Sequence, residues 1–186
     1  MDFYFTPEEE EFRKELRAFL QEQLPSHVDS YGNLRGEDRW KCELQMRRKL
    51  ADKGWLAMSW PKEYGGQGAS FTKQVVYAEE MVYHDAPGRD SFGIGMLGPT
   101  LMIYGTEEQK RQYLGGIARG EVVWCQGYSE PGSGSDLASL QTRAVLDGDD
   151  YVINGQKIWT SGGHRADWMF LLARTDPEAP KHKGIS

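Results

Sequence analysis

The 186-residue sequence predicts an α+β protein in which an all-α helical part precedes a smaller β part. Two observations predict this order. Apolar residues recur at helical spacing through the first two-thirds of the chain. After Glu121, short apolar runs alternate with glycine-containing turns, which is typical of strands. We therefore expect an N-terminal helical domain over residues 1–120 and part of a β-domain over residues 121–186.

The first two helices are each indicated by their ends. The capping box Thr6–Glu9, with proline at the first helical position, predicts the start of a helix that carries an apolar face. Residues 21–37 contain proline and two glycines and indicate a loop. A second helix is expected over residues 38–52, with Gly54 as its left-handed cap.

Three more helices are expected before the β part. Thr72 is the predicted cap of the third helix, and the fourth ends near Tyr104. A second capping box, Thr106–Gln109, predicts the fifth helix, which runs through Ala118.

The β part is indicated by short apolar segments. The expected strands are residues 122–125, 140–146, 151–153, 156–160 and 167–173. Asn154-Gly155 predicts a tight hairpin turn. About 65 residues are few for a closed β-domain without bare edges, so we expect only the start of a barrel-like or sandwich-like domain and a truncated chain.

Composition narrows the class of function. A mean hydropathy of −0.65 and the lack of an apolar run near ~18 residues argue against a membrane span. The net charge of −6 argues against a nucleic-acid partner. The N-terminus carries no basic, cleavable signal, which predicts a cytoplasmic protein. Neither the two cysteines nor the lone His84 and His164 have metal-ligand or catalytic spacing, so we expect no metal.

Two segments are candidates for ligand binding. Residues 127–136 read Gly-Tyr-Ser-Glu-Pro-Gly-Ser-Gly-Ser-Asp, which offers free backbone N–H groups and short hydroxyls to a phosphate or a polar ring edge. Residues 157–161 read Lys-Ile-Trp-Thr-Ser and place a large aromatic beside two hydroxyls, as a planar and partly polar ring requires. A solvent-exposed turn would explain the first segment by composition alone.

One further motif is set aside. Gly93–Gly98 satisfies the G-x-G-x-x-G pattern of dinucleotide sites. It does not follow an expected strand, Pro99 comes directly after it, and no βαβ unit surrounds it. We therefore do not expect a Rossmann fold.

In the order of their residues, the two candidate segments resemble the flavin-binding segments of the acyl-CoA dehydrogenase family. Tyr128 is larger than the aliphatic residue usual at its position. Residues 60–68 resemble the interhelical loop of the family, and residues 105–114 resemble the helix before its β-domain. The resemblance implies that a C-terminal helical domain, absent from these 186 residues, completes the protein.

The resemblance also assigns roles to individual residues. It implies FAD as the cofactor, with three groups of contacts: Gln126, Tyr128 and Ser129 along the flavin ring, Gly134 and Ser135 at the pyrophosphate, and Trp159, Thr160 and Ser161 flanking the ring away from substrate. Ser135 is also expected to touch the acyl-CoA. Met96, Leu97 and Leu101 are expected to line the acyl pocket, although helix packing explains them nearly as well. We interpret Glu130 and Asp136 as structural acceptors of backbone N–H groups rather than catalytic acids.

The function implied is α,β-dehydrogenation of an acyl-CoA to the 2-enoyl-CoA, with electrons passed to an electron-transfer flavoprotein. The family's base is a glutamate expected beyond Ser186, so no catalytic residue is named in this chain. The 186 residues alone are predicted to be inactive and to bind FAD weakly or not at all. A homo- or hetero-oligomer is expected for the full-length protein, and residues 125–130 resemble those of bacterial members that act on bulky or dicarboxylic acyl-CoAs.

Two alternatives stay open on the same scaffold. One is an acyl-CoA oxidase or flavin monooxygenase, because oxygen reactivity depends on solvent access that the sequence does not reveal. The other is a non-catalytic partner subunit or fragment that keeps the fold and lacks the base.

Overall fold

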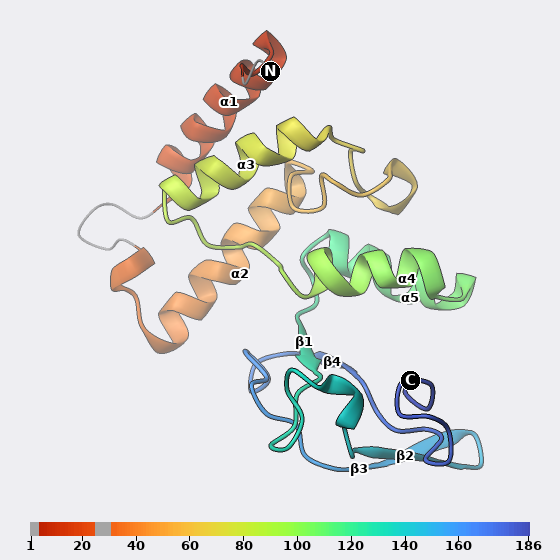
Figure 1. Ribbon diagram of the computed structural model, residues 1–186. Helices are drawn as coiled ribbons and strands as arrows, with labels where there is room; N and C mark the ends of the chain where they lie inside the picture. Colours follow the sequence, from red (N-terminus) through yellow and green to blue (C-terminus); the bar gives the residue numbers. More distant parts are fainter. Residues whose placement is uncertain (1–3, 25–30) are drawn as a thin grey trace. The chain divides into compact units, whose positions relative to one another are not determined.

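The computed structural model describes residues 4–24 and 31–186, and it divides between Glu121 and Val122 into two compact units. The first unit is helical and the second contains the strands (Figure 1), so the predicted α+β class with helices first is confirmed. The helices are α1 (Pro7–Gln23), α2 (Gly36–Asp52), α3 (Phe71–Tyr83), α4 (Gly98–Tyr104) and α5 (Glu107–Ala118). Each helix of the described part is too short or too polar to span a bilayer.

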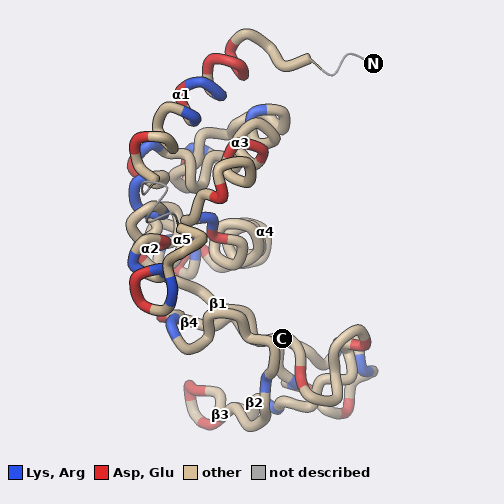
Figure 2. The backbone as a smooth tube through the Cα atoms, turned by 90° about the vertical axis from the view of Figure 1, so that its left-hand side faces the viewer, with Lys and Arg blue, Asp and Glu red and all other residues tan. Residues whose placement is uncertain are grey.

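The two predicted capping boxes are confirmed. Thr6 accepts a hydrogen bond from the Glu9 backbone N–H at 3.3 Å, and the Glu9 carboxylate accepts one from the Thr6 N–H at 2.8 Å. Thr106 and Gln109 make the same reciprocal pair at the start of α5. The first turn of α1 is acidic, and basic residues follow it (Figure 2). The acidic side chains interact favourably with the positive end of the helix dipole.

The predicted cap of α3 was wrong. Ser70, not Thr72, caps this helix, and its hydroxyl accepts a hydrogen bond from the Lys73 N–H at 3.1 Å. Thr72 lies inside the first turn, where its hydroxyl donates to the carboxylate of Glu9 on α1. The Ser70 hydroxyl lies 3.5 Å from the same Glu9 carboxylate, so both hydroxyls at the start of α3 contact α1.

The core of the helical unit lies among α1, α2, α3 and the segment that follows α2. Phe12 and Phe19 of α1 both pack edge-on against Trp55, with ring centroids 5.6 and 5.2 Å apart. The buried members of this core are Phe12, Leu16, Leu20, Met46, Leu50, Trp55, Leu56, Met58, Val76, Met81 and Ala86.

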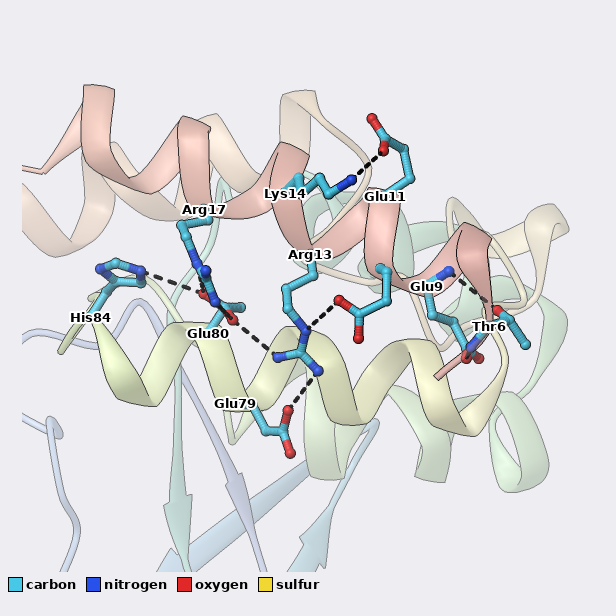
Figure 3. Close-up of polar contacts among 10 residues, drawn as sticks. Thr6, Glu9, Glu11, Arg13, Lys14, Arg17, Glu79, Glu80 and His84 are labelled. Atoms are coloured by element: carbon cyan, nitrogen blue, oxygen red, sulfur yellow. Dashed lines mark hydrogen bonds and ion pairs between the residues drawn. The ribbon is translucent and has the colours of Figure 1, made fainter. Parts of the chain in front are cut away.

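A buried carboxylate also joins α1 to α3. Glu80 of α3 accepts two hydrogen bonds from Arg17, at 2.7 and 3.0 Å, and one from Arg13 at 3.0 Å (Figure 3). The hydrogen bonds from Arg17 lower the pKa of Glu80 and outweigh the opposite effect of burial. His84, for which the sequence predicted neither a catalytic nor a metal-binding role, places its Nε2 3.5 Å from Oε2 of Glu80. The glutamate is thus held by cations from two turns of α1.

The G-x-G-x-x-G motif forms a π-helical turn, Gly93–Leu97, that leads into α4. No strand precedes it among residues 31–92, in line with the prediction that it is not a dinucleotide site. The turn is held by protein groups instead: Asp90 accepts a hydrogen bond from the Gly93 N–H at 2.9 Å, and the Trp60 indole donates to the Ile94 carbonyl at 3.0 Å. A side chain at Gly98 would collide with the Trp60 ring, so this glycine serves packing.

The described part of the second unit contains two separate two-stranded sheets. Strands β1 (Trp124–Gly127) and β4 (Trp168–Leu171) pair in parallel, with Trp124 opposite Trp168. Strands β2 (Arg143–Asp147) and β3 (Asp150–Asn154) form an antiparallel hairpin.

Two predictions in this unit were wrong. The hairpin turn lies at Gly148-Asp149, where Gly148 has a φ of +63°, and not at Asn154-Gly155. Its acidic residues are visible between β2 and β3 in Figure 2. Gly155 follows β3 and packs against Thr142, where a Cβ would collide. The expected strand 156–160 does not form, because Trp159 has a φ of +58° and interrupts the extended backbone.

Candidate functional site

The two segments that the sequence singled out lie side by side in the β unit. The Ile158 N–H donates to the Ser129 carbonyl at 2.9 Å. The Lys157 ammonium donates to the Tyr128 carbonyl, also at 2.9 Å. Neighbouring residues of one segment are therefore hydrogen-bonded to neighbouring residues of the other, although nearly thirty residues separate them in the chain.

Glu130 is the buried acid at the centre of this arrangement. Its carboxylate accepts hydrogen bonds from the backbone N–H groups of Gln141, at 2.6 Å, and Thr142, at 2.8 Å. It also pairs with the Lys157 ammonium at 2.9 Å. Burial alone would raise the pKa of Glu130, but hydrogen bonds from Thr142, Gln141 and Lys157 outweigh it and lower the pKa to about 2. These contacts confirm the interpretation of Glu130 as a structural acceptor of backbone N–H groups.

The glycine-serine loop has a defined shape between its two acids. Glu130 and Ser133 exchange backbone hydrogen bonds at 2.8 and 3.0 Å, which closes a tight turn. The Ser133 hydroxyl donates to the Asp136 carbonyl at 3.0 Å. Asp136 itself is exposed; its carboxylate accepts from the hydroxyl of Ser139 and pairs with Lys181 at 2.9 Å. Both of these donors to Asp136 are side chains, so the expectation that its carboxylate accepts backbone N–H groups was wrong.

The exposure of the predicted cofactor-binding residues increases along the chain, from half-buried at Gln126 to exposed at Ser135. Gln126 lies in β1 and is half-buried. Tyr128 is also half-buried, and its ring meets Phe170 of β4 edge-on at 5.6 Å. Ser129 follows, with its carbonyl engaged by Ile158. Gly134 and Ser135 are exposed, and no heavy atom lies within 4 Å of the place where a Cβ on Gly134 would stand.

Trp159 is the most unusual residue of the second segment. Its φ of +58° lies in the left-handed region, which costs a non-glycine residue on the order of 1–3 kcal/mol. Trp159 is nevertheless 84% exposed. The adjacent Thr160 is half-buried and Ser161 is exposed. A large aromatic side chain held in a strained and exposed position is typical of a ligand site.

The three predicted acyl-pocket residues lie in the helical unit. Met96 is 38% exposed, and Leu101 is half-buried in α4. Leu97 is only 8% exposed, so packing within the unit accounts for it. Gly95, which directly precedes Met96 in the π-helical turn, has no heavy atom within 4 Å of its Cβ position. Met96 and Leu101 therefore have accessible surface, whereas Leu97 does not.

Lys157 is the residue of this site to which the sequence assigned no role. A single lysine at the start of an apolar segment carries no pattern that distinguishes a buried ion pair from a solvated side chain.

Within the described residues, groups of histidine, cysteine and carboxylate that would suit a metal ion are absent.

Comparison with known proteins places this geometry in a family. Residues 6–121 match the family model of the acyl-CoA dehydrogenase N-terminal domain, and residues 125–186 match that of the acyl-CoA dehydrogenase middle domain. Acyl-CoA dehydrogenase FadE26 of Mycobacterium tuberculosis is 44% identical over 191 residues, which cover 100% of this chain and 48% of FadE26. The chain spans about half the length of the curated relatives it matches.

Solved structures agree with this assignment. The ChsE4-ChsE5 complex from M. tuberculosis contains a chain with 44% identity and a TM-score of 0.86, over 100% of this chain and 46% of that one. A structure described as the Tcur3481-Tcur3483 steroid ACAD gives 46% identity and a TM-score of 0.87, over 100% and 48% of the two chains. A glutaryl-CoA dehydrogenase from M. smegmatis, solved in complex with FADH2, gives 27% identity and a TM-score of 0.73, over 92% and 44%. The chain belongs to the acyl-CoA dehydrogenase family, as its two candidate segments predicted.

Proposed function

We propose that the complete protein is an FAD-dependent acyl-CoA dehydrogenase and that the two joined segments of the β unit hold the flavin. The observation that carries this proposal is Trp159, which is exposed and has a strained backbone. Its neighbour Ile158 is hydrogen-bonded to Ser129 of the glycine-serine loop, in which Gly134 is open to solvent. An exposed aromatic wall, free backbone groups and short hydroxyls fit a flat ring with polar edges and a pyrophosphate.

Each residue has a role in this proposal. Gln126, Tyr128 and Ser129 would lie along the flavin ring, and Trp159, Thr160 and Ser161 would flank it. Gly134 and Ser135 would approach the pyrophosphate, and their exposure supports this. Ser135 would also contact the acyl-CoA. FAD, when bound, supplies the two-electron acceptor that dehydrogenation of a thioester needs. The chain's own contribution is to bind and orient: it provides donors toward the ring edge and an apolar wall that keeps water away.

The remaining chemistry lies outside these 186 residues in our proposal. Glu130 and Asp136 are engaged by backbone, lysine and hydroxyl donors, so neither is suited to take the α-proton of a substrate. We place that base in the part of the protein that the relatives have in addition. We expect the isolated 186-residue chain to be inactive and to bind FAD weakly or not at all.

A finer part of the proposal concerns substrate and partners. One similar structure is described as a steroid ACAD, and another as a complex of two named components. We propose a bulky acyl-CoA as substrate, which the open surface at Gly95 and Met96 would accommodate. Leu101 would contribute a further apolar contact. A homo- or hetero-oligomer, electron-transfer flavoprotein as the acceptor and a cytoplasmic location complete the proposal.

The test uses the complete natural polypeptide that carries this sequence. We expect the purified protein to contain FAD and to reduce an artificial one-electron acceptor when an acyl-CoA is added. The value of kcat/KM should be higher for a polycyclic acyl-CoA than for a straight-chain acyl-CoA. A protein that takes up no flavin when FAD is supplied would refute the cofactor assignment. Hydrogen peroxide formation in air, without an added acceptor, would favour the oxidase alternative, and a flavin that no acyl-CoA reduces would favour a non-catalytic subunit.

A further inference from the structure

We infer that Lys157 is a positioning residue that assembles the two halves of the candidate site before any cofactor is bound. This inference rests on the proposed function, since it concerns the same site. The hydrogen bonds of the Lys157 ammonium go to Tyr128 and Glu130 of the loop. Lys157 acts on the site through the residues that it holds.

The contacts of Lys157 carry the inference. Its side chain is 8% exposed and that of Glu130 is 7% exposed, so the ammonium and the carboxylate are paired away from solvent. The ammonium donates to both the Tyr128 carbonyl and the Glu130 carboxylate, each at 2.9 Å. A compact ammonium with three donor hydrogens can satisfy two acceptors of different kinds at once.

The contacts around this pair extend the connection. The next residue, Ile158, donates to the Ser129 carbonyl, so residues 128–130 are held by residues 157–158. The carboxylate of Glu130 accepts from the backbone N–H groups of Gln141 and Thr142, just before β2. A single buried ion pair thus fixes three segments that are far apart in sequence.

Trp159 shows why such fixing is needed. A residue stays in the left-handed region only when its surroundings determine its conformation more strongly than its own preference does. Lys157 and Ile158 supply that constraint before Trp159. After it, the Ser161 N–H donates to the Trp159 carbonyl at 3.0 Å. The backbone of Trp159 is therefore restrained relative to Tyr128 and Ser129 by the anchored pair 157–158.

The same loop offers a matched control. Lys181 and Asp136 also form a lysine–carboxylate pair at 2.9 Å, but their side chains are 54% and 57% exposed. Solvent screens an exposed pair of this kind, so it does little to hold the loop in place. Substitution of each lysine by methionine removes an ammonium group that pairs with an acid of this loop. For Lys157 the pair is buried, and for Lys181 it is exposed.

The experiment compares Lys157→Met, Lys157→Arg and Lys181→Met in the complete protein. The measurements are FAD affinity, by titration of the apoprotein, and the visible absorption band of the bound flavin. We expect Lys157→Met to weaken FAD binding by about tenfold or more and to shift the band toward that of free FAD, because misplacement of a supporting group is costly. Lys157→Arg, which keeps charge and donors, should restore affinity to within about threefold of wild type. Lys181→Met should match wild type.

A measurement on the unmodified apoprotein covers the case in which Lys157→Met does not fold. Amide hydrogen exchange at Gln141, Thr142 and Ile158 should be slow without FAD and no slower with it. Rapid exchange that becomes slow only when FAD is added would overturn the inference, because the cofactor would then assemble the site.

The measurements of FAD affinity can also contradict the inference. If Lys157→Met binds FAD with wild-type affinity and an unchanged band, or if Lys181→Met causes the same loss, Lys157 has no positioning role. Both results leave the proposed function standing. A wild-type protein that binds no FAD would instead refute the proposed function, and this inference with it.

Discussion

The core of the helical unit and the hairpin of β2 and β3 bury their apolar side chains to different extents. Leu16, Leu50 and Val76 of the helical unit are fully buried. In the hairpin of β2 and β3, the apolar side chains are about half exposed or more: Val145, Leu146, Tyr151, Val152 and Ile153. A helix satisfies its backbone internally and needs one neighbour to cover its apolar face, whereas a two-stranded sheet leaves edges and faces open.

The two units are stabilised by different kinds of interaction. The helical unit has a contiguous apolar core, and the Glu80 cluster adds to it. In the β unit, the segments of the candidate site are joined by polar contacts, of which the buried pair of Glu130 and Lys157 is central. The four predictions below test this difference.

The largest effect is expected from the helical core. Leu50→Ala removes a side chain with 0% exposure and should lower the free energy of unfolding of the helical unit by about 2–5 kcal/mol. Ile153→Ala, at 50% exposure in the hairpin, should lower that of the β unit by less than about 1 kcal/mol. Amide exchange reports the two units separately. Equal losses would contradict the comparison.

The next effect is expected from the polar junction of the β unit. Glu130→Ala leaves two backbone N–H groups and the Lys157 ammonium without their buried acceptor, which should cost about 3 kcal/mol in the free energy of opening. Asp136→Ala, in an exposed pair on the same loop, should leave the opening of the unit unchanged. The Thr142 amide is the reporter in both variants. Equal changes in the free energy of opening in the two variants would show that the buried pair is no more important than the exposed one.

Acid should weaken the same junction. The pKa of Glu130 is about 2 in the folded chain against an ordinary value of 4.5, so folding favours the ionised carboxylate. Its contribution is fully present above pH 4.5 and is lost as the pH falls toward 2. We expect the protection of the Thr142 amide to decline over this range. In Glu130→Ala this decline should disappear, while the pKa of Glu80, also lowered, keeps an acid dependence in the helical unit.

The smallest effect is expected at Trp159. Glycine adopts a φ of +58° without strain, so Trp159→Gly should raise the free energy of opening around Ile158 by up to about 1 kcal/mol. Trp159→Ala keeps the strained backbone and should not raise it. Both variants should bind FAD more weakly, because the indole is lost. A gain in Trp159→Ala as large as that in Trp159→Gly would mean that backbone strain is not the cause.

Features that depend on neighbouring residues could be predicted from the sequence. The capping boxes at Thr6 and Thr106 involve groups three residues apart, and the left-handed cap at Gly54 needs only a glycine. The order of helices before strands follows from the change in apolar periodicity near Glu121. The two segments of the candidate site were visible because their residue order resembles that of a known family.

The tertiary structure alone decided the features that depend on distant groups. Thr72 lies inside the first turn of α3 and donates to Glu9 of α1. Gly155 packs on Thr142 and does not form the hairpin turn. The left-handed backbone of Trp159 and the burial of Lys157 have no local signal, because both depend on Tyr128, Ser129 and Glu130, nearly thirty residues earlier. A hydrogen bond between distant segments exists only once the chain has folded, and here such bonds turn two motifs into one site.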